Sequence, residues 1–126
     1  MKTVDVPALP APNGHYAHAI THGELVLVSG QLPIDPETGT PPEGFERQAH
    51  LALARLDRVL TAAGSAPDKV LQVRIYIVGV EHWGTMNACF AEAFGEHRPA
   101  RAIVPVPELH YGCLLEIEAT AIVTSS

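Results

Sequence analysis

Two segments with helical periodicity, each flanked by segments with strand periodicity, constrain this fold more than any other feature of the chain. Apolar residues recur every three or four positions over residues 46–63 and again over 83–95, which predicts two amphipathic helices. Alternating or continuous apolar runs predict strands over residues 15–20, 25–32, 70–80, 102–106 and 114–124. This order, ββαβαββ, predicts one α+β domain over residues 1–126, with both helices packed on one face of a mixed sheet.

Glycine and proline refine this prediction at particular positions. Residues 1–13 form a proline-containing extended lead-in, and residues 33–44 form a loop. Strand alternation places Gly30 on the same face as Val26 and Val28, and a glycine inside a strand indicates a β-bulge or a close approach of another group. Pro105 and Pro107 favour an edge position for the strand after Arg101, because proline donates no hydrogen bond.

Composition limits the partners and the compartment. The chain is 47% hydrophobic and only 17% charged, which leaves apolar surface that an oligomer would bury. A formal net charge of −6 argues against binding to nucleic acid or to an anionic membrane. No apolar run approaches the ~20 residues of a membrane span, and the N-terminal residues do not read as a secretion signal. Because Cys89 and Cys113 are too few for a disulfide framework, we expect a cytoplasmic protein with both cysteines in the core or an interface.

An arginine inside an apolar segment, Arg101, is the strongest chemical signal. A guanidinium keeps its charge and matches a carboxylate with two parallel hydrogen bonds, so Arg101 needs an acidic partner. Alternation in the last strand places Glu116 and Glu118 together on the face away from the core. Two interpretations follow: Arg101 pairs with a nearby glutamate, or Arg101 holds a substrate carboxylate while a glutamate acts on that substrate.

The clustered histidines do not predict a metal site. His15 and His18 are expected on opposite faces of a strand and His22 in a turn, with no cysteine or aspartate to complete a ligand set. Of the three, His18 has the best chance of reaching a site, since alternation puts it on the face of Tyr16.

Four motifs together resemble the Rid family (reactive intermediate deaminases, YjgF-like). Three of them are Gly14-His15-Tyr16-Ala17-His18-Ala19, Leu27-Val28-Ser29-Gly30-Gln31-Leu32-Pro33 and Thr85-Met86-Asn87-Ala88. The fourth and most specific is Pro99-Ala100-Arg101 followed by Leu115-Glu116-Ile117-Glu118-Ala119. The resemblance implies a chorismate-mutase-like fold, a homotrimer and clefts between subunits. It also implies hydrolysis of amino-acid-derived enamines and imines to 2-oxo acids and ammonia, without a cofactor.

The resemblance also implies roles for individual residues. Arg101 matches the carboxylate-binding arginine, Glu116 the glutamate beside the attacking water, and Tyr16 the pocket tyrosine. The positions matched to the pocket lining or to substrate contact are Ser29, Gly30, Asn87 and Ile103, and we add His18 to them.

Departures from the family pattern bear on the substrate. Members that act on 2-aminoacrylate usually have a proline before the tyrosine and a glutamine after it, as in GPYSQA, whereas this chain has His15 and His18. The position two after the arginine, often cysteine, is Ile103. We therefore expect a preference for imines with side chains other than those derived from alanine and serine. The alternative function is a non-enzymatic module that binds small carboxylates or acts like a chaperone, and the acidic charge disfavours the ribonuclease and translation-inhibiting activities also associated with the family.

Overall fold

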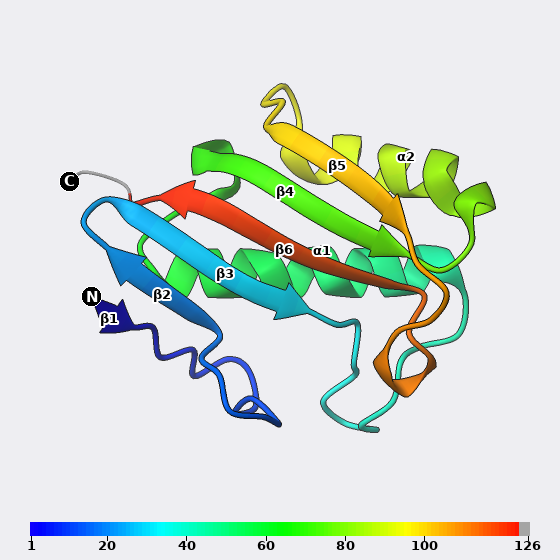
Figure 1. Cartoon of the computed structure of the whole chain (residues 1–126), viewed down its shortest axis with the longest axis horizontal. Coiled ribbons are helices and arrows are strands. Elements are labelled where there is room, and N and C mark those ends of the chain that lie inside the picture. Colours follow the sequence, from blue (N-terminus) through cyan, green and yellow to red (C-terminus); the bar gives the residue numbers. More distant parts are fainter. Residues whose placement is uncertain (124–126) are drawn as a thin grey trace.

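The computed structural model describes residues 1–123, in which six strands form one sheet with two helices against one of its faces (Figure 1). The helices are α1 (Phe45–Ala62) and α2 (Trp83–Phe94). The strands are β1 (Lys2–Thr3), β2 (Ala19–His22), β3 (Leu25–Gln31), β4 (Val70–Ile77), β5 (Ala100–Pro105) and β6 (Leu115–Ile122). Short 3-10 turns cover residues 67–69, 80–82 and 110–112.

The sheet has the strand order β1-β2-β3-β6-β4-β5, so the last strand of the described chain lies near its centre. All neighbours are antiparallel except β4 and β5, which are parallel because α2 crosses over between them. β5 is an edge strand that ends at Pro105, as the proline pattern predicts.

The core lies between the sheet and the helices. α1 buries one stripe of side chains that includes Ala49, Leu56 and Leu60, and these face the strands whose fully buried residues include Ile75 and Ile117. Burial of each such leucine or isoleucine contributes about 1.5–3 kcal/mol relative to exposure. The predicted α+β fold, with both helices on one face of a mixed sheet, is confirmed.

The structure corrects several predicted boundaries. The first hairpin strand begins at Ala19 rather than residue 15, because residues 13–16 form bends in which the Tyr16 N–H donates to the Gly14 carbonyl at 3.0 Å. Within the lead-in, the short strand β1 pairs with β2 and was not predicted. The strand predicted over 70–80 ends at Ile77, and the remaining helix and strand ends shift by one or two residues. Thr124, the predicted end of the last strand, lies outside the described residues.

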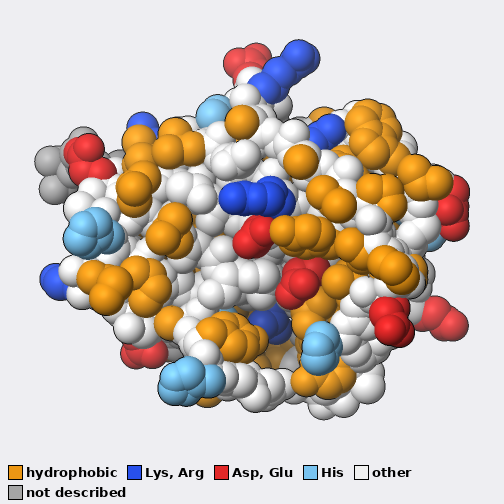
Figure 2. Space-filling model, in the orientation of Figure 1, with side chains coloured by type: hydrophobic (Ala, Val, Ile, Leu, Met, Phe, Trp, Pro, Cys, Tyr) orange, Lys and Arg blue, Asp and Glu red, His pale blue; other side chains and the backbone are white. Residues whose placement is uncertain are grey.

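The face of the sheet opposite the helices, called the open face below, carries exposed apolar side chains. Figure 2 looks onto this face and shows hydrophobic groups spread over it, with charged groups between them. Leu27 on β3 is 50% exposed and Val104 on β5 is 38% exposed. This supports the expectation of an oligomer, which remains a prediction. Neither α1 nor α2 has the length and hydropathy of a membrane-crossing helix, and the described residues contain no other helix that does.

Candidate functional site

A cleft of about 620 Å³ opens at the end of the open face where β3 ends and β6 begins. The N-terminal lead-in, the loop after β3 and the turn before β6 form its walls. We call it the Glu116 cleft, and its polar lining residues are Asn13, Tyr16, His18, Ser29, Gln31, Arg55, His110, Tyr111, Glu116 and Glu118.

Glu116 and Glu118 share the open face of β6, as alternation predicts, but their surroundings differ. The Tyr76 hydroxyl donates to Glu118 Oε1 at 2.5 Å, and Arg74 Nε lies 3.8 Å from the same oxygen. Glu116 has neither a hydrogen bond nor an ion pair from the described residues. Burial, and secondarily the nearby Glu118 charge, raise the pKa of Glu116, while His110 opposes the shift. The Glu118 carboxylate therefore already has side-chain partners, whereas the Glu116 carboxylate is available to interact with a ligand.

Gly30 allows the Glu116 carboxylate to lie where it does. Pairing between β3 and β6 shifts register between Val28 and Gln31, so a bulge falls at the glycine. A Cβ on Gly30 would lie 2.5 Å from Glu116 Oε2. Both predicted reasons for this glycine are confirmed, but the predicted face is wrong. The bulge turns Gly30 from the face of Val26 and Val28 toward Glu116.

Three of the expected pocket residues shape one wall of the cleft. Ser29 Oγ donates to the Ala17 carbonyl at 2.6 Å, which holds the bend that carries Tyr16. His18 is buried, and its Nε2 lies 2.8 Å from the Pro10 carbonyl. Because a carbonyl only accepts, Nε2 must donate, and His18 thereby fastens the lead-in over the cleft. Tyr16 is 55% exposed at the rim, on a loop rather than on the predicted strand.

Arg101 lies elsewhere in the same chain, in a second recess of about 510 Å³ that we call the Arg101 recess. Its Nη1 donates to Asn87 Oδ1 at 3.0 Å, and its guanidinium carbon is 4.8 Å from the Phe90 ring centroid and 5.7 Å from that of Trp83. α2 therefore orients Arg101 through one hydrogen bond and aromatic contacts, while no carboxylate of the described residues pairs with it. Ile103, two residues further along β5, packs against the core and lines neither recess.

Strand pairing places Arg101 and Glu116 on opposite faces of the sheet. Arg101 pairs with Val73, whose side chain is buried under the helices, whereas Glu116 pairs with Tyr76 on the open face. The interpretation that these two residues are each other's ion-pair partners does not hold within one chain. The candidate residues thus form two half-sites, one with Glu116, Tyr16, His18, Ser29 and Gly30, the other with Arg101 and Asn87.

Sequence reasoning missed Arg55, which lines the Glu116 cleft from α1. Burial lowers its pKa, its Nη1 donates to the Ile34 carbonyl at 3.3 Å, and its Nε has no partner among the described residues. A signal was present: Gln48, Ala52, Arg55 and Val59 follow helical spacing, so Arg55 belongs to an inward stripe.

The buried polar atoms without a hydrogen-bond partner gather in this cleft. Among the side-chain atoms of residues 1–123 they are His18 Nδ1, Gln31 Oε1 and Arg55 Nε, and all three residues line the Glu116 cleft. Buried polar atoms are nearly always satisfied, so a cluster of exceptions marks a site that something else completes. Tyr111 on the same rim has a left-handed φ of 61°, a strained conformation for a non-glycine residue of the kind that collects at functional sites.

Comparison with known proteins places the chain in a family. The family model described as Endoribonuclease L-PSP matches residues 7–123. The chain belongs to this family, the Rid (YjgF-like) proteins. The membership predicted from the four motifs is therefore confirmed.

Individual Rid relatives match over almost the full length. A RutC family protein of Pyrococcus horikoshii is 39% identical over 113 residues, which are 89% of this chain and 90% of the relative. The 2-iminobutanoate/2-iminopropanoate deaminase of Salmonella typhimurium is 32% identical over 124 residues, 96% of this chain and 97% of that protein. The crystal structure of E. coli TdcF with bound serine matches with a TM-score of 0.92 at 30% identity, covering 98% of this chain and 100% of that one. The Rid family therefore includes a protein named as a 2-iminobutanoate/2-iminopropanoate deaminase.

Proposed function

We propose that this Rid protein is a cofactor-independent deaminase that hydrolyses amino-acid-derived 2-imino acids, and their enamine tautomers, to 2-oxo acids and ammonia. The observation that carries the proposal is that an unpaired carboxylate, Glu116, and an unpaired guanidinium, Arg101, each line a recess. A small substrate that bears a carboxylate beside an imine needs both groups. The relative named 2-iminobutanoate/2-iminopropanoate deaminase and the relative crystallised with bound serine support this class of substrate.

The complete site is proposed to form between copies of the chain in a homotrimer. Since Arg101 and Glu116 lie on opposite faces of one sheet, the Arg101 recess of one copy must meet the Glu116 cleft of the next. The exposed apolar side chains of the open face supply a reason for association. The three buried polar atoms without partners in the Glu116 cleft are consistent with a site that a neighbouring copy or a ligand completes.

Each residue then has a defined part in the reaction. Arg101, oriented by Asn87, binds the substrate carboxylate with two parallel hydrogen bonds. Glu116 takes a proton from a water that adds to the carbon bearing the nitrogen, and its raised pKa brings it closer to the optimum for a base near neutral pH. With the substrate as its protonated imine, the adduct carries one hydroxyl and one amino group. Glu116 returns its proton to the amino nitrogen, the C–N bond breaks as the C=O bond forms, and ammonia leaves while the hydroxyl proton passes through Glu116 to solvent. Tyr16 at the rim hydrogen-bonds the substrate or this water.

The remaining candidate residues are expected to shape the site rather than to take part in the reaction. Ser29 and Gly30 form the floor near Glu116, and His18 secures the lead-in over the cleft. Ile103 remains a predicted backbone contact. A non-enzymatic module that binds small carboxylates is the second candidate, because an arginine recess alone suffices for binding.

The decisive experiment supplies imino acids generated in situ by an amino-acid oxidase and follows 2-oxo acid formation in competition with semicarbazide. Wild-type protein is expected to accelerate hydrolysis, whereas Arg101→Ala and Glu116→Gln proteins are not. A stable Arg101→Ala protein with unchanged turnover would refute the deaminase proposal. Wild-type protein that binds carboxylates without accelerating hydrolysis would support the binding module instead.

Mixing these two inactive variants tests the shared site. In trimers reassembled from equal amounts of each, roughly a quarter of the clefts combine an intact Glu116 with an intact Arg101, so about that share of activity should return. Sedimentation should give a species three times the 13.5 kDa of the chain. A monomer at micromolar concentration, or no recovery on mixing, contradicts the shared site.

A further inference from the structure

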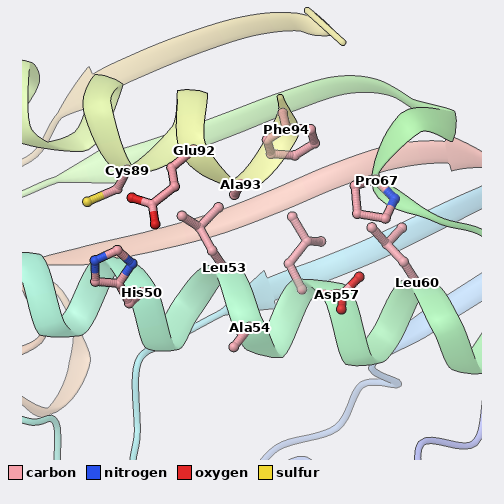
Figure 3. Close-up of a pocket in the computed structure, with 11 residues that line it drawn as sticks. His50, Leu53, Ala54, Asp57, Leu60, Pro67, Cys89, Glu92, Ala93 and Phe94 are labelled. Atoms are coloured by element: carbon pink, nitrogen blue, oxygen red, sulfur yellow. The ribbon is translucent and has the colours of Figure 1, made fainter. Parts of the chain in front are cut away.

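A third pocket lies on the helical side of the molecule, between α1 and α2 (Figure 3). Its volume is about 330 Å³, and its floor is mostly apolar, with Leu53, Leu60 and Phe94 among the lining residues. At one end three residues with metal-binding side chains, His50, Cys89 and Glu92, face one another across the gap between the helices. None of them belongs to the Glu116 cleft or the Arg101 recess.

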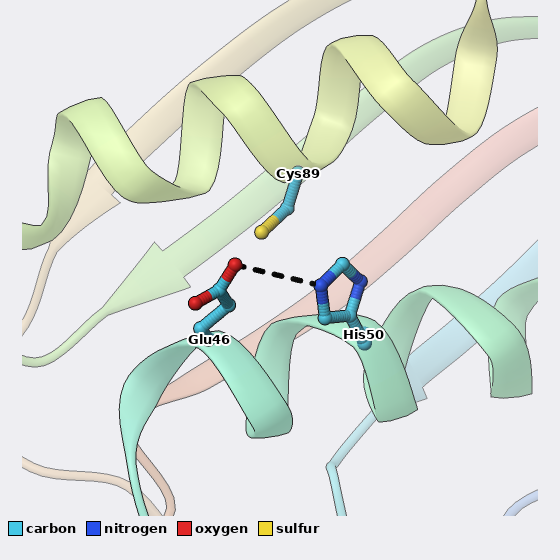
Figure 4. Close-up of side chains that lie close together, drawn as sticks. All are labelled: Glu46, His50 and Cys89. Atoms are coloured by element: carbon cyan, nitrogen blue, oxygen red, sulfur yellow. Dashed lines mark ion pairs between the residues drawn. The ribbon is translucent and has the colours of Figure 1, made fainter.

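The potential ligand atoms converge at this end. Glu46 and His50 are four residues apart on α1, one helical turn, and His50 Nε2 lies 3.8 Å from Glu46 Oε1. Cys89 on α2 is buried, and its sulfur points toward this pair (Figure 4). One ligand atom from each of Glu46, His50 and Cys89 lies within 4.8 Å of the other two.

A tetrahedral ion requires its ligand atoms to lie somewhat closer together than these do. With Zn–N and Zn–O bonds of about 2.0–2.2 Å and a Zn–S bond of about 2.3 Å, neighbouring ligand atoms lie roughly 3.3–3.6 Å apart. The Glu46 and His50 side chains are exposed, so nothing packed against them prevents the rotation that would bring their ligand atoms closer to an ion. Glu92 lies three residues after Cys89 on α2 and lines the same end of the pocket, although its carboxylate is outside the set of ligand atoms that lie within 4.8 Å of one another, so it must turn inward to reach an ion.

We propose that Glu46, His50, Cys89 and Glu92 bind one Zn²⁺ ion that ties α1 to α2. The combination of thiolate, imidazole and carboxylate suits zinc better than magnesium or calcium, which prefer oxygen ligands alone. On binding, the Cys89 thiol releases its proton to solvent and the thiolate ligates the ion, with His50 as a neutral ligand. No metal site was predicted from the sequence, because only the clustered N-terminal histidines were considered. The ligands proposed here lie on two helices that are distant in sequence.

The test uses tag-free protein titrated with Zn²⁺, and separately with Co²⁺ as a spectroscopic probe. Wild-type protein is expected to bind one Zn²⁺ per chain with a Kd of about 1 µM. This affinity is weaker than that of zinc-finger peptides. The Co²⁺ complex is expected to show thiolate-to-cobalt charge-transfer absorption. Absence of Zn²⁺ binding at 100-fold this concentration, or a Co²⁺ complex without that absorption, overturns the proposal.

Matched variants assign the ligands. Cys89→Ala and His50→Gln should each weaken Zn²⁺ binding by more than about 100-fold. Loss of a group that only hydrogen-bonds a ligand weakens metal binding by about 10- to 100-fold, and loss of a direct ligand should weaken it further. Cys113→Ala and His22→Gln, at the other free cysteine and at an exposed histidine, should leave it unchanged. Since His50 is exposed, its variant should fold, and Zn²⁺ should raise the Tm of wild-type but not of His50→Gln protein. Equal weakening in controls and ligand variants contradicts the site.

Glu92→Gln tests the fourth ligand, with Glu96→Gln as the control on an exposed neighbour beyond α2. Weakening only in Glu92→Gln protein supports four protein ligands. Equal Zn²⁺ affinities for these two variants overturn the part assigned to Glu92.

Discussion

Substitution of Gly30 by alanine should separate catalysis from stability in this protein. Gly30 does not have a left-handed backbone conformation, so alanine fits the local backbone. The added Cβ would lie 2.5 Å from Glu116 Oε2 and 2.8 Å from its carboxyl carbon. To restore an ordinary contact of 3.4 Å, that oxygen must retreat by about 0.9 Å. A carboxylate at the end of a flexible side chain can make that move at little cost in folding free energy.

The catalytic cost of the same move is expected to be much larger. A misplacement of about 1 Å lowers rates by up to ~100-fold, so kcat/KM for imine hydrolysis should fall by roughly 10- to 100-fold. The free energy of unfolding should change by less than about 1 kcal/mol, because only the end of one side chain moves. The measurements are 2-oxo acid formation under competition with semicarbazide and denaturant unfolding of the same preparations.

Two controls make the result interpretable. Gly84→Ala adds the same methyl group on α2, where nothing lies within 4 Å, and should keep full activity with a gain of up to about 1 kcal/mol in stability. The Gly30→Ala, Glu116→Gln double variant should be no slower than Glu116→Gln alone, since both changes act through one carboxylate. A Gly30→Ala protein with the wild-type rate, or an additive double variant, would refute this reasoning.

Three further predictions follow from the two half-sites. Arg101→Ala should lower kcat/KM by about 30- to 5000-fold, equivalent to ~2–5 kcal/mol, and Arg101→Lys should restore only part, because an ammonium lacks the planar fork. Full recovery in the lysine variant contradicts bidentate binding. The raised pKa of Glu116 means that its contribution to stability is complete below the ordinary value of 4.5 and is lost as pH rises through the raised pKa. Glu116→Gln should therefore have a higher Tm than wild type at pH 7, with the difference vanishing near pH 4, whereas a lower Tm at pH 7 indicates an ion pair. Because Arg55 is desolvated in the cleft, we expect it to attract an acidic substrate side chain, so Arg55→Gln should slow hydrolysis of acidic imino acids at least ~10-fold while hydrolysis of the alanine-derived imine changes less than ~3-fold. Equal losses of hydrolysis rate on both substrates would indicate that Arg55 has a structural role rather than a role in substrate selection.

The periodicity of apolar residues predicted most of the fold, because helices and strands that pack against one core must bury side chains at regular intervals. The side chains of β6 alternate between buried and half-buried along its whole length, and α1 has a continuous buried stripe. Periodicity failed at residues 15–18, where individual contacts determine the backbone. The bonds from Ser29 to Ala17 and from His18 to Pro10 join residues eight to twelve positions apart and have no repeating signature.

The candidate site was less predictable for a different reason. Alternation within one strand placed Glu116 correctly, but the side on which Arg101 lies depends on the pairing of β5 with β4, which a single strand does not encode. The bulge at Gly30 likewise needs the partner strand to define its direction. Arg55 was overlooked because only the apolar residues of this helix were considered, although its spacing matched an inward stripe.

The central position of β6 has a consequence for how the protein is made. β3 and β4 are synthesised before β6, yet each pairs with it, so both keep an unpaired edge until β6 emerges. Exposed strand edges invite pairing with other chains, and contacts between residues this distant in sequence form slowly. Because β6 also carries Glu116, the same insertion step closes the sheet and installs the proposed base. A nascent chain is thus most prone to aggregate just before the strand that carries Glu116 takes its place in the sheet.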